Sequence, residues 1–173
     1  MNEQQTTTPS ATGLRYGLLT GLVLVIFTAI LYVTDMAGNK LVASLGWLIL
    51  IGGIVMAYQY FKRANNGFMS YGQGLGIGTI LGAVVGLLGG IFAAIYTSMI
   101  DNSIMTREMD KQIEEMEARG LSEEQIEQAM EMANMFTGPV MVVVITLITY
   151  IIGAFILSLI IAAIMKRSQP EFE

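Results

Sequence analysis

Residues 74 to 94 read GLGIGTILGAVVGLLGGIFAA. The stretch holds no charged side chain, and glycine recurs in it at every fourth position. The members of this glycine row are Gly74, Gly78, Gly82, Gly86 and Gly90, and Ala94 continues it. Residues four apart lie on one side of an α-helix, with a drift of about 40° per step. The stretch therefore predicts an apolar helix with a gently winding groove along one side.

A groove without side chains lets another helix approach closely, which favours dispersion contacts that lipid supplies less well. Our interpretation is that the glycine row packs against another helix of the same chain, as in a glycine zipper. Two alternatives remain, because the row could mediate self-association or could line a pore. Leucine at Gly82 or Gly86 should destabilise the protein under the first interpretation, and should change only its oligomeric state under self-association.

The whole chain has the composition of a membrane protein. Of its 173 residues, 54% are hydrophobic and only 13% are charged. The charged residues are gathered into short stretches, which leaves uncharged runs at 16–34, 41–61, 64–100 and 132–165. A bilayer core about 30 Å thick takes roughly 20 apolar residues of helix. Four such runs argue against a water-soluble fold and predict an all-α, four-transmembrane-helix bundle.

Turn and capping signals between the runs predict the organisation of the chain. Gly138 followed by Pro139 suits the end of one helix and the first turn of the next. The run at 64–100 is too long for one crossing, so residues 64–67 are expected to form a turn before a helix that begins near Ser70. The expected segments are a disordered tail at 1–13, spans at 14–34, 41–61, 70–100 and 139–165, an extramembrane segment at 101–137, and a C-terminal tail at 166–173.

The extramembrane segment is acidic and patterned. It carries ten of the fourteen acidic residues and three basic ones. Apolar residues recur at helical spacing on both sides of Gly120, which predicts two amphipathic helices joined there. Ser122 and Gln125 form a capping-box pattern that marks the start of the second helix. We expect an acidic helical hairpin whose apolar stripes pack on each other or against the membrane surface. These stripes are a candidate interaction surface, formed by Met105, Met109, Ile113, Met116, Ile126 and Met130.

Two alternatives would give the hairpin a metal ion to bind. Thioethers at Met130, Met132 and Met135 are ligands that Cu(I) accepts, but methionine is also a common gap filler on helix faces. Carboxylates could take Ca²⁺ or Mg²⁺, but the acidic residues at 114–117 lack the alternating ligands and the glycine of a calcium loop. The chain has no His and no Cys. We interpret the acids as a solvated face and expect no metal or cofactor.

Charged residues inside a membrane span usually mark ion-coupled transport. No Asp, Glu, Lys or Arg lies well inside any expected span, which argues against a pump or a proton-coupled carrier. The G-x-S-x-G, H-E-x-x-H and G-K-[ST] motifs are missing, and the hairpin acids look exposed, so no enzyme is expected. A net charge of −5 argues against nucleic acid as a partner.

The distribution of basic residues predicts the orientation. With four spans, both termini and the 62–67 turn lie on one face. The basic residues of that face are Arg15, Lys62, Arg63, Lys166 and Arg167, and those of the other face are Lys40, Arg107, Lys111 and Arg119. The first group lies within a few residues of span ends, where the positive-inside rule is strongest. We therefore expect both termini in the cytoplasm and the hairpin on the outer side, which in a bacterium means the periplasm. The first span lacks the features of a cleaved signal peptide, so it is expected to stay as an anchor.

The order of these features resembles a family of bacterial membrane proteins, domain of unknown function 4199. The similarity runs from about Gly13 to Lys166. It is strongest in SYGQ at 70–73, SEEQIE at 122–127 and LSLIIAAI at 157–164. Members of the family often carry Asp-Pro soon after the third span, whereas Asp101 is followed here by Asn102. The resemblance implies a four-helix integral membrane protein of no established activity, and it supplies no catalytic residues.

The sequence alone thus predicts a non-enzymatic membrane protein that acts through protein or lipid contacts. The hairpin would be its recognition surface and the third span its packing spine. The expected partners are the lipid bilayer and either a second copy of the chain or another membrane protein. The alternative is a small oligomeric channel or facilitator built around the glycine-rich third helix.

Overall fold

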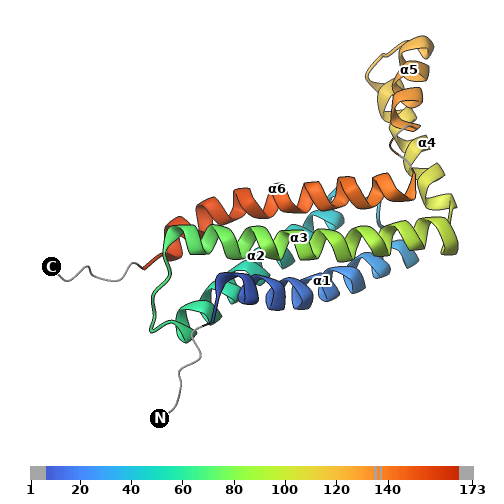
Figure 1. Cartoon of the computed structure of the whole chain (residues 1–173). Helices are drawn as coiled ribbons and strands as arrows, with labels where there is room; N and C mark the ends of the chain where they lie inside the picture. Colours follow the sequence, from blue (N-terminus) through green and yellow to red (C-terminus); the bar gives the residue numbers. More distant parts are fainter. Residues whose placement is uncertain (1–6, 135, 137, 168–173) are drawn as a thin grey trace.

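The computed structural model describes residues 7–134, 136 and 138–167, and this part of the chain is all-α. Its four long helices are α1 (Pro9–Val33), α2 (Lys40–Ala64), α3 (Tyr71–Ile95) and α6 (Pro139–Met165). They lie side by side, and α1 begins at the end of the bundle where α6 finishes (Figure 1). Each is long and apolar enough to cross a membrane, α3 together with the turn that follows it. The predicted all-α fold with four apolar helices is confirmed.

Helix α1 begins earlier than we expected. The side chain of Thr8 caps the helix by accepting the Ala11 N–H at 3.1 Å, and Pro9 stands in the first turn. Proline is favoured there because its missing N–H would have no partner in the first turn. Residues 9–13, which we assigned to a disordered tail, are therefore helical. Residues 1–6 of that expected tail lie outside the described residues.

Helix α2 is longer than the predicted span at 41–61 and ends at Ala64. The Asn39 side chain caps its first turn by accepting two backbone N–H groups. At the other end, the Gly67 N–H donates to the Lys62 carbonyl at 2.7 Å. Gly67 has φ of +85°, a conformation that glycine adopts without steric cost. The turn into α3 therefore begins one residue later than expected.

Helix α3 opens with a capping box, in which Ser70 and Gln73 exchange side-chain-to-backbone hydrogen bonds. It continues into η1 (Tyr96–Ile100), a π-helical turn. There the Asp101 N–H donates to the Tyr96 carbonyl at 2.9 Å, five residues back instead of four. The predicted third span is thus one continuous helix with a wider last turn. This turn lies where the Tyr96 ring packs on Tyr32, with ring centroids 4.8 Å apart.

Between α3 and α6 the chain turns away from the bundle (Figure 1). This segment contains the helices α4 (Ser103–Ala118) and α5 (Glu123–Asn134). Gly120, with φ of +79°, ends α4 by donating its N–H to the Glu117 carbonyl at 2.8 Å. Ser122 and Gln125 exchange the two hydrogen bonds of a capping box in front of α5. Helices therefore lie on both sides of Gly120, where the apolar spacing placed them.

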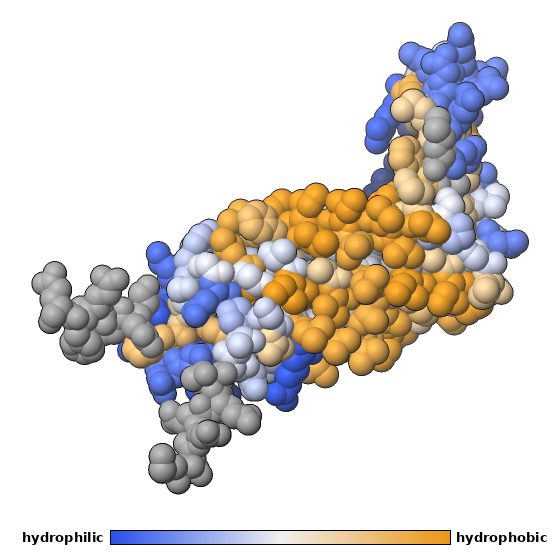
Figure 2. All heavy atoms as spheres, in the orientation of Figure 1, coloured by the Kyte–Doolittle hydropathy of each residue, from blue (hydrophilic) through white to orange (hydrophobic). Residues whose placement is uncertain are grey.

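The core lies along the bundle, where α3 packs between α1 and α6. Among its fully buried side chains are Tyr58 and Phe61 of α2 and Ile77 and Leu81 of α3. Helix α6 is more exposed than the other three long helices, because only 6% of its most apolar 18-residue stretch is buried. On the face drawn in Figure 2, apolar residues cover the middle of the bundle, and hydrophilic residues lie toward its ends and on α5. An apolar surface of this extent is suited to lipid.

Candidate functional site

The glycine row of α3 is covered by α6. All five glycines are buried. A methyl group added at Gly86 would come within 2.8 Å of the Leu147 Cα atom, and one added at Gly90 would lie 3.0 Å from the Val143 Cα atom. These neighbours are backbone atoms, so rotation of a side chain would not relieve the overlap. In the structure the glycine row thus packs against α6 of the same chain, and it lets the two helix backbones approach closely.

Small residues on α6 complete this contact, and our sequence analysis did not identify them. They are Ala154, Ser158 and Ala162, which are all fully buried. They face Gly82, Gly78 and Gly74 respectively. Their spacing of four residues is the same signal that identified the row on α3. It was missed because it is embedded in a run of large aliphatic residues.

A third row of small residues, Gly13, Gly17 and Gly21, lies on α1 and packs against another side of α3. A methyl group at Gly17 would lie 2.8 Å from the Val84 Cβ atom and 3.2 Å from the Leu81 Cα atom. This row also escaped the sequence analysis, because it crosses the boundary that we expected between tail and span. Helix α3 is therefore contacted closely on two sides.

One polar cluster lies inside the bundle. Tyr58 of α2 is fully buried, and its hydroxyl donates to the Gly74 carbonyl at 2.8 Å. Ser158 of α6 is also fully buried and lies beside this hydroxyl. Among the described residues, its Oγ atom has no partner with ordinary hydrogen-bond geometry. The cluster joins α2, α3 and α6 near the start of α3, and its burial indicates a role in packing.

Ion pairs hold α4 against the loop between α1 and α2. Arg107 donates from Nη1 to Asp35 at 3.0 Å and from Nη2 to Asp101 at 2.9 Å. Farther along α4, Glu115 pairs with Lys40, the first residue of α2. Asp35 lies in the α1–α2 loop, so α4 is attached near that loop at two points along its length. We call these contacts of Arg107 and Lys40 the α4 attachment.

Two carboxyls of the α4 attachment, Asp101 and Glu115, are held in their charged form. Hydrogen bonds from Ser103, together with the charge of Arg107, hold the pKa of Asp101 below its ordinary value of 3.8. A hydrogen bond from Lys40 and its charge hold the pKa of Glu115 below 4.5. A carboxyl whose pKa is lowered on folding stabilises the folded arrangement at pH values above its ordinary pKa. This stabilisation is lost as the pH falls through the lowered pKa of the folded state.

We therefore expect the contact between Glu115 and Lys40 to keep α4 in place at pH values above the ordinary glutamate pKa of 4.5, and α4 to separate from the loop as the pH falls below that value. Spin labels on cysteines introduced at Met36 and Gln112, two exposed positions on the loop and on α4, would report the distance between them. The same labels in a variant with both Arg107 and Lys40 changed to glutamine should show the separated distance already at pH 7. A distance that stays constant down to pH 2, or that changes between pH 7 and 5, would contradict this expectation.

The predicted interaction surface is partly covered in the structure. Ile126 is buried, and Met105, Met109, Ile113, Met116 and Met130 are half-buried. Met105 faces a cavity of about 280 Å³ that is also lined by Tyr32 and Val142 of the bundle. The exposed face of α4 and α5 is instead acidic, formed by Asp110, Glu114, Glu115, Glu117, Glu123, Glu124, Glu127 and Glu131. We call this the acidic face.

The described side chains considered for metal binding differ in their surroundings. Met132 is 61% exposed while Met130 is half-buried, and Met135 lies outside the described residues. Within the ranges that the structure describes, no three acidic residues are grouped as a metal ion would require. The geometry therefore adds nothing to either metal hypothesis.

Together, four apolar helices packed through small residues and two shorter helices at one end define an α-helical protein of the multi-pass membrane class. Residues 15–167 match a family described as protein of unknown function, DUF4199. The match covers most of the chain, so the protein belongs to this family, and the resemblance seen in the sequence is confirmed. Neither the curated proteins nor the solved structures gave a significant match.

Proposed function

We propose that the protein is a non-enzymatic protein of the bacterial inner membrane that binds a membrane-protein partner through the acidic face of α4 and α5. The main observation behind this proposal is the α4 attachment. Because Arg107 pairs with Asp35 of the α1–α2 loop and Glu115 pairs with Lys40 of α2, the α4 part of the acidic face has a defined position, and less ordering is needed when a partner binds. The charge complement of this face is a basic surface on the partner, which favours fast and selective association.

We further propose that the acidic face lies in the periplasm and the termini in the cytoplasm. The basic residues at the other end of the bundle are Arg15, Lys62, Arg63, Lys166 and Arg167. Across residues 7–134 and 138–167, none of them pairs with a carboxylate, whereas all four basic residues at the α4 end do. Cations without an acidic partner remain available to the anionic headgroups of the cytoplasmic leaflet.

A channel built around α3 gains no support from the packing. The glycine row would have to line a pore, but α6 covers it. The glycines of α1 are buried against α3 in the same way. Neither row is available to a second copy of the chain unless the bundle opens, so the geometry favours an interaction protein over an oligomeric facilitator.

Site-specific photo-crosslinking in intact membranes tests the proposal. A photoreactive residue at Gln128, exposed on α5, should give an adduct with a discrete protein, and one at Gln59, exposed at the other end of α2, should not give the same adduct. Glutamine at Glu123, Glu124 and Glu127 together should abolish the Gln128 adduct, because the charge complement is lost, and high salt should weaken it. An adduct that is unaffected by both changes, or one with twice the mass of the chain, would contradict the proposal.

A further inference from the structure

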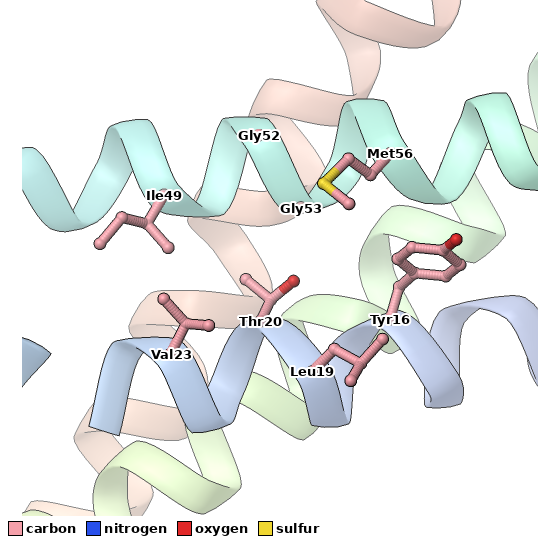
Figure 3. Close-up of a pocket in the computed structure, with 8 residues that line it drawn as sticks. All are labelled: Tyr16, Leu19, Thr20, Val23, Ile49, Gly52, Gly53 and Met56. Carbon is pink, nitrogen blue, oxygen red and sulfur yellow. The ribbon is translucent and has the colours of Figure 1, made fainter. Parts of the chain in front are cut away.

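A groove runs between α1 and α2 and opens to the surface of the bundle (Figure 3). Its volume is about 230 Å³, and it is lined by Tyr16, Leu19, Thr20, Val23, Ile49, Gly52, Gly53 and Met56. The groove exists because Gly52 of α2 leaves space beside α1, next to Gly53, where the two helices meet at Thr20. A methyl group added at Gly52 would meet nothing within 4 Å. Leu19 and Val23 are about half exposed on its rim, at 52% and 51%.

The groove has the shape and chemistry of an acyl-chain site. It runs along α1 from Tyr16 to Val23, seven residues or about 10 Å. Its lining is apolar apart from the hydroxyls of Tyr16 and Thr20. Water in such a groove would find too few hydrogen-bond partners, whereas a hydrocarbon chain would gain dispersion contacts along its length. The acyl chains of the surrounding bilayer are ligands of this chemistry.

A cation stands at the end of the groove nearest the start of α1. Arg15 precedes Tyr16, and its Nη1 atom donates to the Tyr60 hydroxyl at 3.0 Å. The guanidinium also lies over the Tyr60 ring, 4.9 Å from its centroid. Arg15 is exposed and, in the described part of the chain, forms no ion pair. Arginine presents five N–H donors in a planar fork that matches a phosphate, so a positioned guanidinium keeps donors for an anion.

We propose that the groove between α1 and α2 binds one acyl chain of an anionic phospholipid whose phosphate is held by Arg15. Along α1, the Arg15 guanidinium comes first and the apolar groove follows it. A phospholipid has the same order, with its headgroup followed by its acyl chain. The lipid would belong to the leaflet at the start of α1. This site is at the opposite end of the bundle from α4 and does not depend on the partner proposed for the acidic face.

Native mass spectrometry of the full-length protein, with phosphatidylglycerol and phosphatidylcholine as the two added lipids, tests this site. The wild type should retain one phosphatidylglycerol per chain. Arg15→Gln should weaken phosphatidylglycerol binding about tenfold, because a charge-assisted hydrogen bond is lost. It should weaken phosphatidylcholine binding less, because the choline ammonium already neutralises the phosphate of that lipid. Gly52→Leu should fill the groove and abolish retention of both lipids.

Matched controls separate this site from unspecific lipid at the surface. Gly76→Leu makes the same change where an added methyl group also meets nothing within 4 Å, and Arg63→Gln removes an exposed cation near the same end of the bundle. Both should bind phosphatidylglycerol like the wild type. Val23→Trp should also block the groove, from the α1 side. It serves as the second groove variant in case Gly52→Leu lowers the melting temperature. Wild-type retention in both groove variants, or equal weakening by Arg15→Gln and Arg63→Gln, would overturn the proposal.

Discussion

Replacing Gly86 by leucine is expected to separate α6 from the rest of the bundle. Even an alanine Cβ atom at this position would lie 2.8 Å from the Leu147 Cα atom and 3.1 Å from the Leu147 carbonyl oxygen. Overpacking of this kind costs about 1–3 kcal/mol for a small group. The higher helix propensity of alanine returns up to about 1 kcal/mol of that cost. Gly86→Ala should therefore lower the free energy of unfolding modestly, and Gly86→Leu should prevent stable packing of α6.

Thermal denaturation in detergent micelles measures both changes, and Gly76 supplies the control. Gly76 belongs to the same helix, but a methyl group there meets nothing within 4 Å. Gly76→Ala and Gly76→Leu should leave the melting temperature unchanged or raise it slightly, because they gain helix propensity without overlap. Equal losses at the two positions would contradict this account, because the loss would then not depend on contact with α6. A stable Gly86→Leu variant with a changed oligomeric state would instead point to self-association through the glycine row.

The lengths of the apolar runs predicted the number of long helices but not where each helix ends. The run that begins at Tyr16 is bounded by Arg15, yet α1 continues through this arginine back to Pro9. Lys62 and Arg63 likewise lie inside α2. Long basic side chains can reach the interface from within a helix. A charge therefore marks the edge of the hydrocarbon and leaves the helix free to extend beyond it.

The arrangement of the helices around α3 required the structure. The spacing of glycines showed that one side of α3 accepts a close neighbour, but α1 and α6 both carry small residues at the same spacing. The sequence does not say which of them meets which side. The groove between α1 and α2 is a further example, because it arises from side chains on two helices whose relative placement is a tertiary property.

The candidate site could be predicted only in part. Helical periodicity identified the apolar stripes of α4 and α5, but it could not say what covers them, and Met105 proves to face the bundle. The α4 attachment joins residues 72 and 75 positions apart. No local pattern encodes such pairs, because each partner alone is an ordinary surface charge. The sequence indicated the solvated acids, but the fixed position of α4 became visible only in three dimensions.

An all-or-none difference is expected in the chemical labelling of the two ends of the bundle. Helices α4 and α5 lie at the end opposite to the start of α1 and the finish of α6 (Figure 1). Four membrane crossings by helices of the observed length would place Glu117 and Ser168 on opposite sides of the bilayer. The chain has no cysteine, so a single cysteine introduced at either position reports on that position alone.

The labelling would use Glu117→Cys and Ser168→Cys, expressed in separate cells, and a thiol reagent that does not cross membranes. In spheroplasts, we predict labelling at position 117, and labelling at position 168 only after the membrane is made permeable. Labelling at 168 alone would keep the four crossings but reverse the orientation. If both positions are labelled from the same side, or if the protein is found in the soluble fraction, the four-span arrangement is wrong.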